Sequence, residues 1–159
     1  MPCANLTKPL KFKTDVEANI AKLKPYVPEL VQNGADSLFC CEENQLRDLF
    51  EQVDTARQLL NRCPSCYYNF VRIYLNMACN PRQWEFVRVL DFNETDRTVN
   101  QINYYISKRY VDEMYDSCIN INNPTTGQSV LGTMLCLGLK PNETCTPDRL
   151  MKSLGKKGT

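Results

Sequence analysis

Hydrophobic residues recur at helical spacing over two long segments in the middle of the chain. Between residues 42 and 62 they return every three or four positions, which predicts an amphipathic helix with one buried face: Leu46, Leu49, Phe50, Val53, Ala56, Leu59 and Leu60. A second stripe begins after Pro64, a residue favoured in the first turn of a helix, and ends near Cys79. The sequence therefore predicts two consecutive helices, joined at residues 63–66 and packed as a pair.

The pattern changes to alternation after residue 83. Residues 84–92 place Trp84, Phe86, Arg88, Leu90 and Phe92 on one side, as in a strand that is buried mainly on one face. Residues 93–96 have turn composition, so residues 98–106 can return as the second strand of a hairpin. Shorter helices are predicted at 14–24, 107–118, 128–135 and 147–154. The predicted class is α+β, helix-dominated, with a small β-hairpin.

Length and charge narrow the range of functions. A chain of 159 residues with 43% hydrophobic residues and a net charge of +1 fits a single globular domain with no nucleic-acid partner. Its apolar stretches are too short to cross a bilayer. The chain contains no histidine, which excludes catalytic triads that need an imidazole base.

Cysteine is the most informative residue type in the composition. Nine cysteines in a chain of this length predict a disulfide-rich domain from an oxidising compartment. Three N-glycosylation sequons, at Asn5, Asn93 and Asn142, point the same way. Zinc is the alternative, since Cys63-Pro64-Ser65-Cys66 has metal-ligand spacing, but a second such motif and histidine are both missing from the sequence. Disulfides without a bound metal are therefore favoured.

Two further features suggest that the chain is a fragment. The sequence from Met1 onward contains no signal peptide, although the cysteines and sequons predict export. The odd number of cysteines also leaves at least one thiol that is free or paired outside the chain. We therefore expect a truncated domain.

Two motifs leave alternatives open. Cys63-Pro64-Ser65-Cys66 is similar to the redox motif of thioredoxin-like enzymes. A helix is predicted before it, however, where such enzymes have a strand. A thiol oxidoreductase is therefore the third candidate function, after the two that are described below. Gln45 lies one turn before Leu49, at the edge of the apolar stripe. On spacing alone, the favoured interpretation is that its amide bonds water or backbone at the edge of the helix. The alternative is that the amide is the single polar contact of an apolar pocket.

Seven motifs follow one another along the chain in a distinctive order. They are Leu38-Phe39-Cys40-Cys41, Gln45-Leu46, Arg62-Cys63-Pro64-Ser65-Cys66-Tyr67-Tyr68-Asn69, Cys79-Asn80-Pro81-Arg82-Gln83, Tyr104-Tyr105-Ile106, Met114-Tyr115-Asp116-Ser117-Cys118, and Leu135-Cys136 before Cys145. In this order they resemble the N-terminal lumenal domain of the Niemann–Pick type C sterol transporter family. The match covers most of residues 38–150, whereas residues 1–37 match loosely.

The resemblance implies a single cysteine-rich sterol-binding domain over residues 1–159, which is not an enzyme and needs no cofactor or metal. It would bind cholesterol or a related sterol in a lumenal or extracellular pocket, as part of intracellular sterol transport. It implies two protein partners: a small soluble lysosomal sterol carrier and the membrane-embedded remainder of a transporter, with this domain on the lumenal side of the lysosome or late endosome. The alternative is an extracellular cysteine-rich interaction domain that binds a protein and no lipid.

The resemblance also implies roles for particular residues. It pairs Cys41 with Cys79, Cys66 with Cys118, and Cys136 with Cys145, and it places the partners of Cys3, Cys40 and Cys63 beyond the two ends of the chain. Gln45 falls on the family's glutamine that hydrogen-bonds the sterol 3β-hydroxyl. Leu49 and Gln52 fall on wall positions of the same helix, and Met134 and Leu135 match a leucine pair at the pocket entrance that acts in sterol transfer.

The sequence departs from the family pattern at two places. Pro2 stands where the family has a second, hydroxyl-binding asparagine. Two family cysteines that pair with each other are replaced together, one by Leu75 and the other by Lys24 or a neighbour. Losing both halves of a disulfide is less harmful than losing one. The family's upstream pocket segment is also absent from this sequence, so sterol affinity is the property that we expect these departures to affect.

Overall fold

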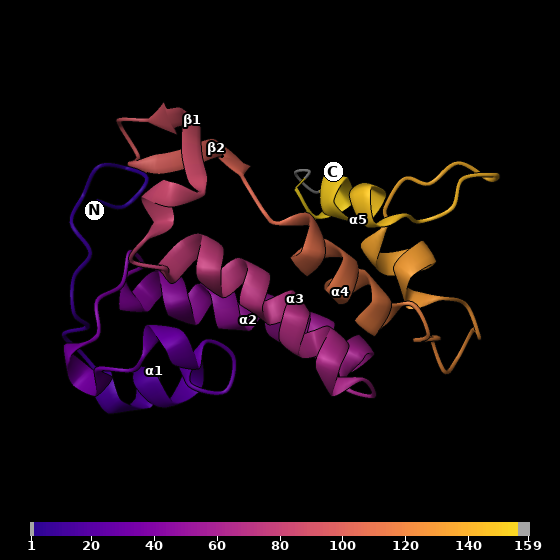
Figure 1. The fold of residues 1–159 in the computed structure, drawn as a ribbon, viewed down its shortest axis with the longest axis horizontal. Coiled ribbons are helices and arrows are strands. Elements are labelled where there is room, and N and C mark those ends of the chain that lie inside the picture. The colour runs from indigo at the N-terminus through magenta and orange to yellow at the C-terminus, as the bar shows by residue number, and fades with distance from the viewer. Residues whose placement is uncertain (1, 156–159) are drawn as a thin grey trace. The chain divides into compact units, whose positions relative to one another are not determined.

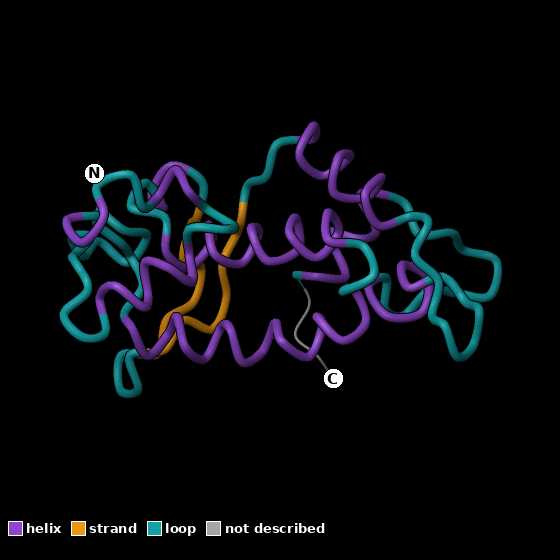
Figure 2. Tube along the Cα trace, turned by 90° about the horizontal axis from the view of Figure 1, so that it is seen from below, coloured by secondary structure: helices purple, strands orange, loops and turns teal. Residues whose placement is uncertain are grey.

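A computed structural model describes residues 2–155 of the chain. It divides into two compact units, one formed by residues 1–53 and 71–105 and the other by residues 54–70 and 106–159 (Figure 1). Helices account for most of the regular structure (Figure 2). The helix-dominated, disulfide-rich α+β class predicted from the sequence is confirmed.

The two long helices follow the hydrophobic pattern closely. Helix α2 spans Glu43–Leu60 and helix α3 spans Pro64–Cys79, as the two apolar stripes predict. Residues at helical spacing on each are buried, among them Leu46 and Val53 on α2 and Val71 and Leu75 on α3. Residues 43–53 of α2 and 71–79 of α3 belong to the first unit, and the other residues of both helices belong to the second. The apolar face of each helix therefore contributes buried residues to the cores of both units.

The first unit also contains helix α1, Val16–Leu23, and a two-stranded antiparallel sheet. Strand β1, Val87–Asn93, pairs with strand β2, Thr98–Tyr104, in a register that sets Val89 opposite Ile102. The register shifts between Val89 and Phe92, so the ladder is irregular on the side of the turn. Short 3₁₀ turns at Pro28–Leu30, Gly34–Asp36 and Gln83–Glu85 complete the unit.

The first strand differs from the sequence-based expectation in two ways. It begins at Val87 and not at residue 84, because Gln83–Glu85 form a 3₁₀ turn held by the side chain of Gln83. That amide donates from Nε2 to the carbonyl oxygen of Met77 (2.6 Å) and accepts at Oε1 from the backbone N–H of Ala4 (2.9 Å). The buried side of the strand is that of Val87, 2% exposed, whereas Leu90 on the other side is 52% exposed.

The second unit contains helix α4, Lys108–Cys118, a five-residue π-helical turn at Leu131–Leu135, and helix α5, Pro147–Leu154. Side-chain oxygens cap two of them: Ser107 accepts from the backbone N–H of Tyr110, and Thr146 accepts from that of Arg149, each at 3.2 Å. Buried side chains of this unit include Leu60, Phe70, Met114, Val130 and Leu150.

Four disulfides join residues within the same unit. The three pairs that the resemblance implies are present: Cys41–Cys79, Cys66–Cys118 and Cys136–Cys145. The expectation for Cys3 and Cys40 is wrong, because these two pair with each other.

Antiparallel pairing of the N-terminal segment with residues near Phe39 explains the disulfide between Cys3 and Cys40. Leu10 and Phe39 exchange two backbone hydrogen bonds of 2.9 Å in an antiparallel bridge, and the ring of Phe12 stacks on that of Phe39 at 4.2 Å. The N-terminal segment therefore runs back along residues 38–41. This brings the Cα atoms of Cys3 and Cys40 to 5.6 Å, a usual separation for a disulfide, and leaves Cys63 as the free cysteine.

Candidate functional site

A depression of about 340 Å³ in the first unit is the strongest candidate for a binding site. Its walls are mainly apolar and come from the end of helix α3 and from the hairpin: Met77, Ala78, Val87, Val89, Val99 and Ile102. Amide side chains, including those of Gln45 and Gln83, supply polar groups at its rim. Apolar walls with a few polar groups, at a size of roughly 300–1,000 Å³, are typical of small-molecule sites.

Gln45 lies at the third position of helix α2 and has a structural bond of its own. Its Oε1 accepts a hydrogen bond from the backbone N–H of Glu42 at 2.9 Å, which is half of a capping box at the helix N-terminus. Its Nε2 group has no partner among residues 2–155, so both N–H donors are available. The amide thus bonds backbone through its oxygen and keeps its N–H donors free at an exposed residue that lines the apolar depression.

Glu43, two residues earlier, anchors the N-terminal segment to the same helix end. Its carboxylate accepts from the backbone N–H groups of Lys13 and Thr14. Donation from Lys13, the largest cause, lowers the pKa of the Glu43 carboxyl below its ordinary value of 4.5. A lowered pKa means that this carboxylate contributes its full stabilisation at neutral pH and loses it as the pH falls through the lowered value.

The remaining predicted site residues are not among those that line this depression. Leu49, half-buried, and Gln52, exposed, continue along α2 and are not among the residues that line it. Met134 and Leu135 lie in the π-helical turn of the second unit, where the side chain of Leu135 is buried. Of the five sterol-site residues predicted from the sequence, the structure places Gln45 at the depression.

The hairpin walls are the part of the candidate site that sequence reasoning missed. Val87 and Val89 are two positions apart on one strand, so the alternating pattern places them on a common face. That signal was present in residues 84–92, but it did not show which face of the strand is buried. Gln83 was also missed as a wall residue, although its side chain fixes the turn that leads into the strand.

A second depression, of about 410 Å³, lies in the second unit beside the free thiol. Polar residues, including Arg62, Asp116 and Asn120, line most of it, and Cys63 Sγ donates to the carbonyl oxygen of Ser117 at 3.3 Å. Cys66, the other cysteine of the motif, is bonded to Cys118. The motif therefore lacks the second free thiol that a thioredoxin-like dithiol needs.

Two further features bear on the function classes considered above. Among residues 2–155, no three or more histidine, cysteine or acidic side chains gather as metal ligands would, and no helix combines the length and hydrophobicity that a membrane span requires. Of the three sequon asparagines, Asn5 and Asn142 are exposed. Asn93 is half-buried, and its Nδ2 donates to Asp96 at 3.2 Å.

The chain is a helix-dominated, disulfide-rich domain with an apolar depression bordered by amide side chains. These features place it among candidate small-molecule-binding domains. The family model described as "Niemann-Pick C1 N terminus" matches residues 1–159. The chain belongs to this family.

Individual relatives agree with the family match. The chain is 33% identical over 105 residues to the NPC intracellular cholesterol transporter 1 of Sus scrofa, a match that covers 61% of this chain and 8% of that protein. It is 27% identical over 161 residues to the NPC1-like intracellular cholesterol transporter 1 of Homo sapiens, covering 98% and 11%. The Drosophila melanogaster homolog 1b of NPC intracellular cholesterol transporter 1 is 28% identical over 158 residues, covering 95% and 12%. The chain thus spans about a tenth of the length of these relatives.

Proposed function

We propose that this chain binds cholesterol or a related sterol and takes part in intracellular sterol transport. The observation that carries the proposal is Gln45, which lines a mainly apolar depression and whose Nε2 group has no partner within residues 2–155. Membership of the family and the printed names of the relatives, which are cholesterol transporters, support it. No catalytic role and no cofactor form part of the proposal.

The chemistry of a sterol suits these surroundings. A sterol is almost entirely hydrocarbon with one hydroxyl group, and burial contributes about 0.8 kcal/mol for each CH2 group. A hydrogen bond from Gln45 adds only about 1 kcal/mol to affinity. Its larger effect is on selectivity, because a ligand whose hydroxyl is esterified or inverted leaves a desolvated amide unpaired, at a cost of about 1–3 kcal/mol.

Two substitutions at Gln45 separate ligand binding from helix capping. Gln45→Ala removes both the cap and the donor, and we expect it to weaken sterol binding about tenfold and to relax selectivity for the 3β-hydroxyl. Gln45→Glu keeps an oxygen that can accept from Glu42 and exchanges the N–H donors for a second acceptor. It should preserve helix α2 but weaken binding of a 3-keto steroid, which can only accept, whereas a 3-hydroxysterol can still donate to the carboxylate.

The measurement is equilibrium binding of radiolabelled cholesterol, with the 3α-epimer and a 3-keto steroid as competitors and circular dichroism as the check on folding. Unchanged affinity and selectivity in both variants would remove Gln45 from the site. Loss of binding in the alanine variant, with unchanged 3-keto steroid affinity in the glutamate variant, would assign the residue to capping alone.

Met134 and Leu135 are proposed to act at the pocket entrance. Met134→Trp or Leu135→Phe is expected to slow sterol transfer between the chain and liposomes several-fold, with a smaller change in equilibrium affinity. A bulky residue at an entrance slows entry and exit of the ligand alike, so their ratio changes less than either rate. Ile119→Trp, at an exposed position on the same unit, is the control. Equal effects on rate and affinity would count against an entrance role.

The proposed setting is the lumenal side of the lysosome or late endosome, as part of a larger membrane protein. Four disulfides support an oxidising compartment. A small soluble sterol carrier and the membrane-embedded remainder of a transporter are the proposed partners. Asn5, Asn93 and Asn142 stay predicted glycosylation sites, which glycosidase treatment of secreted material would test.

One observation favours the alternative function, a cysteine-rich domain that binds a protein and no lipid. Strand β1 exposes Leu90 and Phe92, each more than 40% exposed, and neither lines the depression. Exposed apolar side chains gathered on one small sheet are typical of protein contact surfaces. Binding of a fluorescent sterol distinguishes the two functions, since a domain that only contacts proteins would give no saturable signal.

A further inference from the structure

One predicted glycosylation site belongs to the apolar depression of the first unit. Asn5, in the sequon Asn5-Leu6-Thr7, is an exposed residue and is also one of the residues that line the depression. The other two sequon asparagines, Asn93 and Asn142, are not among the lining residues. A glycan carried by Asn5 would therefore start from the wall of the candidate binding site.

The Asn5 amide leaves its nitrogen available for this modification. Its Oδ1 accepts hydrogen bonds from the backbone N–H of Thr7 at 3.2 Å and from the Thr7 hydroxyl at 2.6 Å. Its Nδ2 has no partner among residues 2–155, so the folded domain can carry a sugar on this nitrogen without breaking a hydrogen bond among them. At Asn93, by contrast, Nδ2 already donates to Asp96 Oδ2 at 3.2 Å.

The residue before Asn5 is bonded to the same side chain as the wall of helix α3. The backbone N–H of Ala4 donates to Gln83 Oε1 at 2.9 Å. Gln83 Nε2 donates in turn to the carbonyl oxygens of Met77 and Ala78, at 2.6 and 3.3 Å, and both of these residues line the depression. One amide side chain thus fixes the N-terminal segment against the end of α3.

A disulfide and two backbone bonds fix the same turn further. Cys3 is bonded to Cys40, which is another of the residues that line the depression. The backbone N–H of Leu6 donates to the carbonyl oxygen of Cys3 at 2.9 Å, and the N–H of Cys3 donates to the carbonyl oxygen of Thr7 at 2.7 Å. The sequon is therefore part of an ordered turn that is covalently attached to the wall.

We propose that an N-linked glycan on Asn5 obstructs the depression, so that glycosylation of this residue weakens sterol binding there. This inference rests on the proposed function. In the transfer reaction, Asn5 Nδ2 bonds the anomeric carbon of a lipid-linked oligosaccharide pyrophosphate, the bond from that carbon to the phosphate oxygen breaks, and Nδ2 loses one proton. The group that it gains is bulky and hydrophilic. Attached to a lining residue, it competes for the space through which an apolar ligand must reach the apolar walls.

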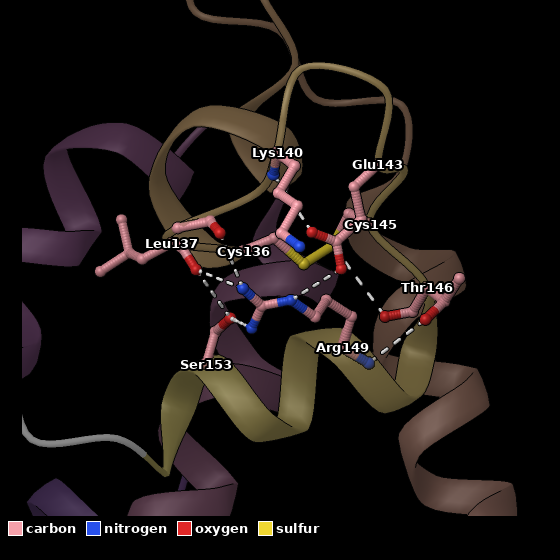
Figure 3. A network of polar contacts seen from close by, with 9 residues as sticks. Cys136, Leu137, Lys140, Glu143, Cys145, Thr146, Arg149 and Ser153 are labelled. Carbon is pink, nitrogen blue, oxygen red and sulfur yellow. Dashed lines mark hydrogen bonds and ion pairs between the residues drawn. A yellow bond between two sulfur atoms is a disulfide. The ribbon is translucent and has the colours of Figure 1, made fainter.

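Asn142 provides a matched control, because it is a sequon asparagine in a turn that is equally ordered. It is exposed and lies in the second unit, in the loop closed by the Cys136–Cys145 disulfide. Figure 3 shows how Arg149 holds this loop: its Nη2 donates to the carbonyl oxygen of Leu137 at 2.9 Å, and its Nε donates at 3.3 Å to Glu143, the middle residue of the sequon. The two sequons share exposure and an ordered backbone, but this one does not line the depression.

The test uses the full chain, secreted from cultured cells behind an export signal. Mass spectrometry of its peptides, after enzymatic release of glycans in heavy-oxygen water, measures the occupancy of each sequon. Asn5→Gln and Thr7→Val remove the first sequon through two different exposed residues, so an effect common to both belongs to the glycan. Thr7→Ser keeps that sequon, and Asn142→Gln removes the control sequon.

We expect Asn5 to be occupied in the unsubstituted chain, and radiolabelled cholesterol to bind about tenfold more tightly to Asn5→Gln and to Thr7→Val. Thr7→Ser and Asn142→Gln should have the affinity of the unsubstituted chain. Trimming the glycan of the folded, unsubstituted chain to its first sugar with an endoglycosidase should raise its affinity part of the way toward that of Asn5→Gln.

The outcomes separate the modification, the obstruction and the proposed function. An unoccupied Asn5 in the secreted chain overturns the modification. An occupied Asn5 with equal affinity in the unsubstituted chain, Asn5→Gln and Thr7→Val overturns the obstruction and leaves the proposed function intact. An equal gain in Asn142→Gln assigns the effect to glycans in general and also overturns it. If Asn5→Gln and Thr7→Val bind no sterol, the proposed function fails, and obstruction of a sterol site fails with it.

Discussion

Replacing Cys66 and Cys118 together by alanine is expected to lower the free energy of unfolding by roughly 4 kcal/mol. The bond joins the first turn of helix α3 to the last residue of helix α4 across a sequence separation of 52. A cross-link that closes a loop of this length removes a large conformational entropy from the unfolded chain, and about 4 kcal/mol is the upper figure from the loop-closure relation. Both sulfurs belong to fully buried residues, so alanine avoids placing a hydroxyl in the core.

Urea denaturation of the oxidised proteins measures this effect. The Cys136→Ala/Cys145→Ala pair provides a graded comparison, because its sequence separation of 9 predicts a smaller loss of roughly 3 kcal/mol. Cys63→Ala is the control for removing a cysteine without a disulfide. A loss in Cys63→Ala as large as that in the Cys66 and Cys118 pair would show that the bond is not the source.

Leu75→Ala is expected to cost about 2–5 kcal/mol of unfolding free energy. Leu75 lies on helix α3 with 0% of its surface exposed, so truncation leaves a cavity in the core of the first unit. Leu90→Ala, on the exposed side of strand β1, removes the same atoms at a position where solvent already reaches the side chain and should change stability by about 0.5 kcal/mol or less. Similar losses in the two variants would contradict burial as the cause.

Leu75 has a further interest, since the family resemblance sets it where the family carries a bonded cysteine. Of the candidates for the other half of that pair, Lys24 is exposed and its neighbour Leu23 is fully buried. This chain therefore buries two large aliphatic side chains, Leu23 and Leu75, in the unit where the family pattern has a disulfide. Hydrophobic burial is the stabilising contribution that remains at these positions.

The periodic parts of the fold were predictable because their signal is local. Amphipathic spacing gave both long helices to within a few residues, since each turn of such a helix repeats the same requirement for burial. Strand β1 was predicted three residues too early, because alternation does not show that Gln83 makes tertiary contacts with Ala4 and Met77. The pairing of Cys3 with Cys40 depends on a chain reversal at Leu10 and Phe39, which has no periodic signal.

The candidate site was likewise predictable only where its signal is local in the sequence. Spacing placed Gln45 at the edge of an apolar stripe, and the residue lies at the rim of the depression. Its capping bond was not predicted, because the usual sequence signal has serine or threonine three residues earlier and this chain has Glu42. The opposing walls come from a hairpin far along the chain, so only the folded structure brings them to Gln45.

The divided use of the Gln45 amide biases the contact toward guests with a lone pair. Its carbonyl oxygen already uses one of two lone pairs on the main chain of Glu42, whereas both N–H groups of the side chain are unpaired within residues 2–155. N–H groups bond only an acceptor. On the proposed function, a 3-keto steroid should therefore be tolerated at this contact as well as the alcohol.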